Sequence, residues 1–274
     1  MVKKYMEHVS FPIRINRYLA IKGFATRRGA DELITKRWVT INGRIALLGD
    51  IVQKTDIVEV KKTAREKRNF AYIAYHKPVG IITQSPKPAN GGSGDAALNA
   101  AFSPQRRERS IGDMISKEAA GLFPVGRLDK DSSGLLILTN DGRITDRLLN
   151  PKYQHQKEYI VETDKKITPH VLRLLERGVD IEGYHTKPSH TQFVADHKFR
   201  ITLYEGKKHQ IRRMLAALGL QVRSLKRIRI MNIELGKMKE GEMRRLTEDE
   251  IKIFLSTLGL ATNVLENRRR TDAF

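Results

Sequence analysis

Cysteine is absent from the sequence. Its absence excludes disulfide bonds, zinc sites with cysteine ligands and thiolate nucleophiles, and it fits a reducing compartment. Long hydrophobic runs are also missing, since no stretch approaches the roughly 18 consecutive apolar residues of a membrane-spanning helix. The amino-terminal residues 1–7 are basic but lack the apolar run of a signal peptide. We therefore expect a cytoplasmic protein.

Negative charge is scarce relative to positive charge. The chain has 51 Lys and Arg against 31 Asp and Glu, which gives a formal net charge of +20. A surplus of this size attracts polyanions, and nucleic acid is the natural partner because each neutralised phosphate releases counterions. The 274 residues, 40% of them hydrophobic, suffice for one ordinary domain with a small one, or for two modest domains. Composition alone also fits a protein that is merely basic.

Residues 12–62 have the pattern of a small, compact α/β unit. A first short helix is expected to end at Gly23, and a second helix is expected to follow Thr26, which is a candidate N-cap. Asn42-Gly43 is the strongest short signal for a β-hairpin. The expected strands of this unit are residues 38–41, 45–48 and 57–60.

Residues 70–256 are expected to form the second domain, after a charged linker at 63–69. Residues 84–120 are rich in Pro, Gly, Ser and Ala, which is typical of a loop excursion. Strands and helices are mixed without regular βα alternation, which favours an α+β fold over a doubly wound sheet. A basic tail is expected at 257–274. The expected strands of this domain are 70–75, 135–139, 158–163 and 199–204, and the expected helices are 145–149, 168–177 and 209–218.

The most informative segment is the loop at 123–134, which is rich in small residues and leads into an apolar strand. It presents the carboxylate of Asp129 between Arg127 and Lys130, and loops held by a rigid strand often carry catalytic groups. A calcium-binding loop fits poorly, because Asn140 stands where a bidentate Glu is required. A phosphate-binding loop of the GxxxxGK[ST] type is absent. On spacing alone, an Asp that caps a turn is favoured over a catalytic Asp.

Four short motifs follow one another along the chain. They are Lys-Pro-Val-Gly at 77–80, Gly-Arg-Leu-Asp at 126–129, Lys-Glu-Tyr-Ile-Val at 157–161 and Glu-Gly-Lys-Lys-His-Gln-Ile-Arg-Arg-Met at 205–214. Together they closely resemble the motifs of bacterial pseudouridine synthases of the RsuA, RluB, RluE and RluF branch. Residues 227–232 and 246–250 look most like the RluF enzymes, and residues 14–60 resemble the small RNA-binding module of the branch.

This resemblance implies a fold and an activity. A ribosomal-protein-S-four-like RNA-binding domain at 12–62 would precede a catalytic domain at 70–256, in which helices and loops flank a mixed, mostly antiparallel bent sheet. The implied activity is isomerisation of a specific uridine in RNA to pseudouridine, without metal or organic cofactor. RluF enzymes modify 23S ribosomal RNA and can also act on a transfer RNA. Structured RNA is thus the implied partner of a monomeric enzyme.

The resemblance also implies catalytic roles for three residues. Asp129 matches the carboxylate that acts on the sugar, as nucleophile or as base, in a closed and dry pocket. Arg212 matches the basic residue that pairs with this carboxylate and keeps it ionised while buried. Tyr159 matches the aromatic residue that stacks on the target base. As alternatives, Arg212 could contact an RNA phosphate, and Tyr159 could be a packed core tyrosine.

A further set of cations is expected to contact RNA. Arg127 matches the arginine that these enzymes place near the everted base, where a planar guanidinium can fill the gap in the stack. Contacts to the RNA backbone position the enzyme and carry little sequence information. The remaining expected RNA-binding residues are Lys130 and Arg213 in the catalytic domain, and Arg14, Arg17, Arg27 and Arg28 in the small module.

Two positions depart from the pattern of the family. His76 stands where Asn usually precedes Lys-Pro, and Arg37-Trp38 replaces a glycine that is usual in the small module. The stretch at 84–120 looks longer than is usual in the family.

A metal site is not expected, because the histidines lack the spacing of metal ligands and have no cysteine companions. The histidines considered are His155, His185, His190 and His209.

Two other functions fit parts of the sequence. One is a non-catalytic RNA-binding or ribosome-assembly protein built on the same scaffold, and the other is an enzyme that acts on a free nucleoside. The presence of Asp129, Tyr159 and Arg212 together argues against the first, and the basic surface with its extra module argues against the second.

Overall fold

The computed structural model describes residues 11–25, 27–61, 70–83, 109–114 and 121–260. The chain divides into two compact units, one formed up to Phe70 together with 140–145, and the other from 71–139 and from 146 onward. The linker expected at 63–69, most of the 84–120 stretch and all of the expected basic tail after residue 260 lie outside the described residues.

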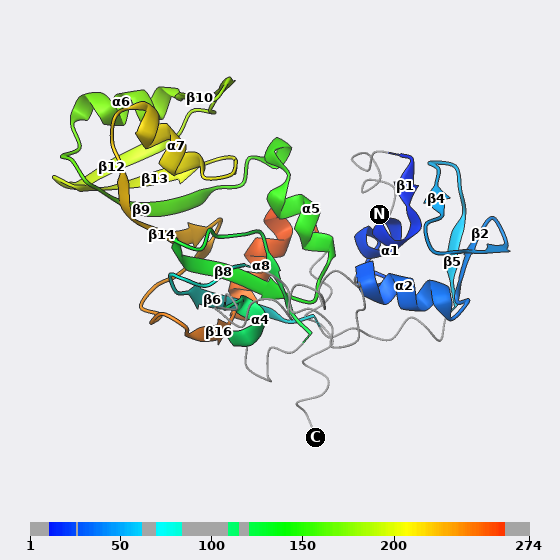
Figure 1. Ribbon diagram of the computed structural model, residues 1–274. Helices are drawn as coiled ribbons and strands as arrows, with labels where there is room; N and C mark the ends of the chain where they lie inside the picture. Colours follow the sequence, from blue (N-terminus) through cyan, green and yellow to red (C-terminus); the bar gives the residue numbers. More distant parts are fainter. Residues whose placement is uncertain (1–10, 26, 62–69, 84–108, 115–120, 261–274) are drawn as a thin grey trace, which may run out of the picture. The chain divides into compact units, whose positions relative to one another are not determined.

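The first unit combines two helices with short strands (Figure 1). Its core contains Ile15, Leu19, Ala30 and Val39, all of them inaccessible to solvent. Strands β2, β3 and β5 form an antiparallel sheet in the order β3-β2-β5, and β1 pairs with β4. The elements are β1 (Ile13–Arg14), α1 (Ile15–Ile21), α2 (Arg27–Thr35), β2 (Val39–Ile41), β3 (Arg44–Ile45), β4 (Ile51–Val52) and β5 (Val58–Val60).

The predicted hairpin of the first unit is confirmed. Asn42 and Gly43 join β2 to β3 with φ angles of 51° and 79°, which is the pattern of a type I′ turn. Arg37 also has a positive φ of 59°, so it adopts the left-handed conformation within the Arg37-Trp38 pair, where the resemblance implies a glycine. The strand predicted at 45–48 was wrong beyond Ile45. The pair β1–β4 was not predicted.

The second unit is built on a mixed sheet of nine strands. Seven of them follow the order β12-β13-β9-β14-β8-β6-β16, while β15 pairs with β14 and β7 with β8. Among its described strand pairs, β8 and β14 run parallel and the others antiparallel. The strands are β6 (Tyr72–Lys77), β7 (Phe123–Val125), β8 (Ser133–Thr139), β9 (Lys157–Thr163), β12 (His190–Ala195), β13 (Lys198–Leu203), β14 (Val222–Ile230), β15 (Ile233–Glu234) and β16 (Met243–Arg245).

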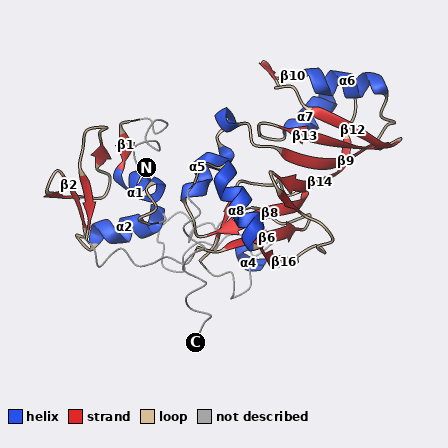
Figure 2. Ribbon diagram, turned by 180° about the vertical axis from the view of Figure 1, so that it is seen from behind, coloured by secondary structure: helices blue, strands red, loops and turns tan. Residues whose placement is uncertain are grey.

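Helices cover both faces of this sheet (Figures 1 and 2). Helices α6 and α7 pack on β9 and β13, where Leu175 and Met214 meet Phe199 and Ile201 in one core cluster. Helix α4 packs on β6 and β8 through Ile111. The helices are α4 (Ile111–Met114), α5 (Arg143–Leu149), α6 (Pro169–Arg177), α7 (Gln210–Ala217) and α8 (Glu248–Thr257), and a small pair of strands, β10 (Asp180–Ile181) and β11 (Tyr184–His185), lies outside the main sheet.

Local capping explains where several helices begin. Thr168 accepts a hydrogen bond from the amide of Val171 at the start of α6, and Thr247 with Glu250 forms a capping box at α8. The structure confirms the predicted α+β class with a mixed, mostly antiparallel sheet. No helix among the described residues is long and apolar enough to span a membrane.

Candidate active site

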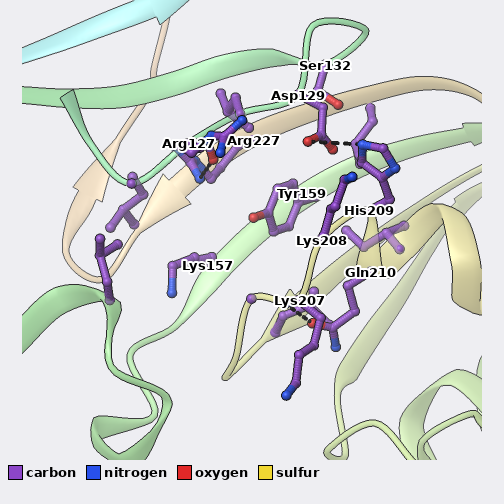
Figure 3. A pocket seen from close by; sticks show the side chains of 18 of the residues that line it. Arg127, Asp129, Ser132, Lys157, Tyr159, Lys207, Lys208, His209, Gln210 and Arg227 are labelled. Atoms are coloured by element: carbon purple, nitrogen blue, oxygen red, sulfur yellow. Dashed lines mark hydrogen bonds and ion pairs between the residues drawn. The ribbon is translucent and has the colours of Figure 1, made fainter. Parts of the chain in front are cut away.

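A pocket of about 550 Å³ opens in the second unit, at the point where β8, β9 and β14 lie side by side (Figure 3). The loop before β8, strand β9, strand β14 and the segment before α7 each contribute to its wall. Its polar lining residues are Arg127, Asp129, Ser132, Lys157, Tyr159, Lys207, Lys208, His209, Gln210 and Arg227.

Backbone contacts fix the loop that carries Asp129. The hydroxyl of Thr83 donates to the carbonyl oxygen of Leu128 at 2.7 Å and accepts from the amide of Leu128 at 3.1 Å. The amide of Gly80 donates to the carbonyl oxygen of Lys130 at 2.8 Å. The Lys-Pro-Val-Gly motif and the residues after it therefore hold the main chain on both sides of Asp129.

Position 134, at the start of β8, requires a glycine. Its φ is 115°, and a Cβ added there would lie 2.2 Å from the carbonyl oxygen of Arg227 on the parallel strand β14. A side chain at this position would therefore push β14 away from β8. Gly134 lets the two strands approach and brings Arg227 to the pocket wall.

Asp129 lines the pocket and faces His209 (Figure 3). The Nε2 atom of His209 lies 3.4 Å from Oδ1 of Asp129, and the two side chains are 48% and 37% exposed. His209 has a left-handed backbone, with a φ of 53°, and stands at the N-cap of α7. The carboxylate is thus only partly buried in this structure, which differs from the expectation of a buried carboxylate in a closed, dry pocket.

Arg212 does not form the expected ion pair with Asp129 in this structure. Its Nη2 atom donates to the main-chain carbonyl oxygen of Asp131 at 2.8 Å, and its Nη1 atom donates to that of Val222 at 3.4 Å. Among the described residues, the potential ion-pair partner of Asp129 is His209, which is charged only when its ring is protonated. Arg212 instead links helix α7 to the loop of Asp129, two residues beyond the carboxylate.

Tyr159 projects from β9 into the same pocket as Asp129. Its neighbours across the sheet are Arg227 on β14 and Ile201 on β13. Lys157 precedes it by two residues, so both side chains project from the same face of β9. The pocket therefore combines a carboxylate, a phenol and two cations that come from the sheet.

Burial lowers the pKa of two lysines in this unit, Lys157 and Lys77. Burial, and then the charge of Arg227, lowers the pKa of Lys157 to about 8. Burial also lowers the pKa of Lys77 to about 8, although the charges of Asp129 and Asp131 act in the opposite direction. The Nζ atom of Lys77 donates to the carbonyl oxygen of Pro78 at 2.8 Å.

A buried carboxylate fixes the segment before α7. Glu205 accepts hydrogen bonds from the hydroxyl of Tyr184 at 2.6 Å, the amide of Lys187 at 3.0 Å and Nε2 of Gln210 at 2.8 Å. Gln210 in turn accepts from the amide of Lys207 at 2.9 Å. This network holds the residues that lead to His209. Glu205 was not predicted as a site residue, although its motif was recognised.

The expected RNA-binding cations have different surroundings. Arg127 is exposed and lines the pocket, whereas Lys130 in the same loop is exposed but is not a lining residue. Arg213 is engaged with Glu182, whose Oε2 lies 2.7 Å from its Nη2. In the first unit, Arg14 and Arg17 are exposed, whereas the side chains of Arg27 and Arg28 lie outside what the structure describes.

Histidines and carboxylates do not gather into a metal site in the described part of the chain. No group of three or more potential ligands is close enough to hold an ion there. His155, His185, His190 and His209 therefore remain separate, and His209 has Asp129 as its partner. His76 is buried, with Nδ1 2.9 Å from the carbonyl oxygen of Met238.

Comparisons with known proteins place the chain in a known family. A sequence model described as RNA pseudouridylate synthase matches residues 71–217, and a model described as S4 domain matches residues 13–58. The dual-specificity RNA pseudouridine synthase RluF of Escherichia coli (strain K12) is 38% identical over 242 residues, which cover 87% of this chain and 77% of that protein. The ribosomal large subunit pseudouridine synthase B of Bacillus subtilis (strain 168) is 33% identical, covering 87% and 94%.

A solved structure shares the fold over most of the chain. A crystal structure of a pseudouridylate synthase superposes with a TM-score of 0.61 at 26% identity, covering 88% of this chain and 99% of the other. The pocket of Asp129 and Tyr159, the S4 domain and these relatives lead to one conclusion. The chain belongs to the RNA pseudouridine synthase family and is an RNA pseudouridine synthase, an isomerase that acts on RNA.

Proposed function

We propose that this enzyme isomerises a uridine of 23S ribosomal RNA, and a uridine of a transfer RNA as well, with Asp129 as the catalytic carboxylate. The observation that carries the catalytic proposal is that Asp129 and Tyr159 line one pocket from different elements. The RNA targets are proposed from the identity to enzymes named RluF and to one named for the large ribosomal subunit.

The reaction needs few chemical groups. The bond between ribose and N1 of uracil breaks, the ring turns, and a bond to C5 forms while the C5 proton leaves and N1 regains a proton. Asp129 acts on the sugar, as nucleophile or as base. Tyr159 stacks on the uracil and keeps it in the pocket while the ring turns. The isomerisation written in this way requires no electron carrier and no group carrier.

The other expected residues take supporting roles in the proposal. Arg212 acts through the main chain of Asp131 and positions the loop that carries Asp129. Arg127 fills the gap left by the everted base. The RNA backbone is held by Lys130 and Arg213, and by Arg14, Arg17, Arg27 and Arg28 of the S4 domain. Glu182 must release Arg213 for that contact.

The organisation of the enzyme is part of the same proposal. We expect a monomer that works in the cytoplasm, with the S4 domain at 12–62 and the catalytic domain at 70–256. Sedimentation of the full chain with and without RNA measures the oligomeric state. A stable dimer in the absence of RNA would contradict the proposed monomer.

The catalytic proposal is tested on RNA transcripts that carry tritium at C5 of uridine. Formation of pseudouridine releases the tritium, so the wild-type protein should release it from 23S ribosomal RNA and from its transfer RNA substrate. Asp129→Asn should abolish release while RNA binding, measured by filter retention, stays nearly unchanged. The matched control is Asp196→Asn, an exposed carboxylate paired with Lys166 at 2.6 Å and outside the pocket.

Two results would count against this function. Wild-type protein that releases no tritium from either RNA would favour a non-catalytic RNA-binding protein. Turnover of free uridine at a rate comparable to that of RNA would favour a nucleoside enzyme. Mapping of pseudouridines in cells with and without the protein then identifies the modified uridine.

A further inference from the structure

Strands β9 and β14 bring two cations, Lys157 and Arg227, to the pocket wall. Arg227 and Lys157 both line the pocket beside Tyr159. Arg227 stands opposite Tyr159 on the neighbouring strand, and Lys157 lies two residues before Tyr159 on β9. Among the ion pairs of the described residues, none includes Arg227 or Lys157.

Arg227 is almost completely buried, with 3% of its surface exposed. Its Nε atom donates to the carbonyl oxygen of Leu135 at 2.8 Å, and its Nη1 atom donates to that of Arg127 at 3.4 Å. Its Nη2 atom is buried and has no hydrogen-bond partner. A guanidinium carries five N–H donors and cannot lose its charge in a protein. A buried, unused donor on a charged group is costly unless a ligand satisfies it.

Lys157 is half-buried and also lacks a strong hydrogen bond. Its hydrogen bond from Nζ to the carbonyl oxygen of His155 is long, at 3.5 Å. The neighbouring carboxylate of Glu158 is occupied, since it binds Arg229 at 2.7 Å and Arg200 at 3.4 Å. Burial and the charge of Arg227 lower the pKa of Lys157 to about 8. Its surroundings thus disfavour the positive charge that this lysine carries.

Asp129, the carboxylate of the pocket lining, does not pair with Arg227 or Lys157. Asp129 lies next to His209, and Tyr159 is drawn between Asp129 and Lys157 in Figure 3. The pocket therefore has Asp129, where the sugar is expected, on one side of the phenol and Lys157 on the other. An anion bound by both Arg227 and Lys157 would satisfy the free donor and neutralise two charges that burial otherwise penalises.

We propose that Lys157 and Arg227 form an anion subsite that holds a phosphate group of the everted nucleotide. The proposal rests on the proposed function in taking this anion from the RNA. Every nucleotide within an RNA has a phosphate on each side of its ribose, which places an anion close to any sugar that reaches Asp129. A uracil carbonyl oxygen is a weaker candidate, because it is neutral and would leave both charges uncompensated.

The subsite gives the enzyme a way to orient the nucleotide. A phosphate held at Lys157 and Arg227 fixes one end of the nucleotide while its sugar lies at Asp129 and its base on Tyr159. Because the phosphate does not change during the reaction, the sugar and phosphate stay in place while the ring turns. Binding energy from this non-reacting group is thus used to position the reacting bond.

The test uses the full-length protein and three soluble probes, namely uridine, uridine 5′-monophosphate and uridine 3′-monophosphate. Their dissociation constants are measured by NMR titration. We expect at least one monophosphate to bind about tenfold more tightly than uridine, which is the effect of one charge-assisted contact. The favoured isomer tells which phosphate of the nucleotide the subsite takes. Lys157→Met should remove most of this preference and leave the affinity for uridine unchanged.

The matched control is Lys252→Met, which removes the same charge from an exposed position of α8 outside the pocket. Lys252→Met should keep the preference for the monophosphate, because it changes only the long-range charge of the protein and leaves the pocket intact. Arg227→Lys is a second variant that keeps the charge but loses the planar donor set, and it should weaken the preference.

A pH titration separates a phosphate contact from a purely structural role. A bound phosphate stabilises the charged form of Lys157, so monophosphate affinity should fall as the pH rises through about 8. The phosphate of the probe is already fully ionised there, since its second pKa is about 6. Lys157→Met should remove this part of the pH dependence.

Equal affinity of wild-type protein for uridine and both monophosphates, or the absence of detectable binding of any probe, would overturn the subsite. So would a preference that survives Lys157→Met, or a Lys157→Met variant whose turnover falls while its monophosphate affinity is unchanged. Failure of the proposed function looks different. In that case the protein releases no tritium from RNA, whatever its preference among the three probes.

Discussion

Nε2 of His209 lies 3.4 Å from Oδ1 of Asp129, at the entrance of a helix that begins one residue later. This contact joins two motifs that lie far apart in the sequence. It also gives the proposed catalytic carboxylate a neighbour other than the arginine that the resemblance implies. We expect replacement of Arg212 to lower kcat more than replacement of His209.

We expect His209→Ala to lower kcat by less than about tenfold. The two side chains are partly exposed, and ion pairs of that kind contribute roughly 0–1 kcal/mol. Tritium release from 23S ribosomal RNA measures the effect, with Asp129→Asn as the inactive reference. A loss as complete as that of Asp129→Asn would mean that His209 takes part in the chemistry.

Arg212→Met should have a larger effect on kcat, although Arg212 does not touch the carboxylate of Asp129. Its bond to the carbonyl oxygen of Asp131 is charge-assisted, and losing such a bond costs about 1.5–3 kcal/mol. We expect kcat to fall tenfold to a hundredfold and Arg212→Lys to restore part of it. If Arg212→Met left kcat unchanged, the proposed positioning role would be wrong.

Glu205→Gln should destabilise the fold by about 1–3 kcal/mol, because three donors lose a charged, buried acceptor. The apparent KM for RNA should rise as well, since the segment from Lys207 to His209 loses its support. Urea denaturation and tritium release measure the two effects. The control is Glu182→Gln, an exposed partner of Arg213 whose replacement should change stability by less than about 0.5 kcal/mol.

Gly134→Ala should be among the most damaging single substitutions in the catalytic domain. The added methyl would meet the backbone of Arg227 at 2.2 Å, and a φ of 115° is unfavourable for alanine. We expect a loss of more than about 3 kcal/mol. Gly121→Ala is the matched control, since Gly121 has a φ of 82° but no atom within 4 Å of the added methyl. Its cost should be about 1–2 kcal/mol. Equal costs for the two variants would contradict the close approach of β8 and β14.

Lys77 should make stability depend on pH. Its pKa is about 8 in the folded protein against 10.5 in the unfolded chain, so the unfolded chain binds more protons in that range. The destabilisation from burying a charged Lys77 is fully present below pH 8 and decreases as the pH rises toward 10.5. The free energy of unfolding, measured by urea denaturation, should therefore increase between about pH 7 and about pH 9.5. This increase should be smaller for Lys77→Met than for wild type, by at most about 2 kcal/mol. An identical gain in both proteins would place the pKa of Lys77 near its ordinary value.

The sequence by itself determined the features that depend on neighbouring residues. The Asn42-Gly43 hairpin and the helix that follows Thr168 both depend on local backbone preferences. The four motifs identified the family, and Asp129 and Tyr159 were named as site residues before their pocket was known. These predictions needed no knowledge of how distant strands pair.

The tertiary structure decided the surroundings of these residues. β14 runs parallel to β8 at Gly134, and this pairing brings the guanidinium of Arg227 into the pocket from a position 93 residues further along the chain. The same packing buries Lys157, directs Arg212 to the carbonyl oxygen of Asp131 and leaves His209 beside Asp129. Burial and long-range pairing set which charges are desolvated and which donors stay unused. Local sequence preferences carry no information about either.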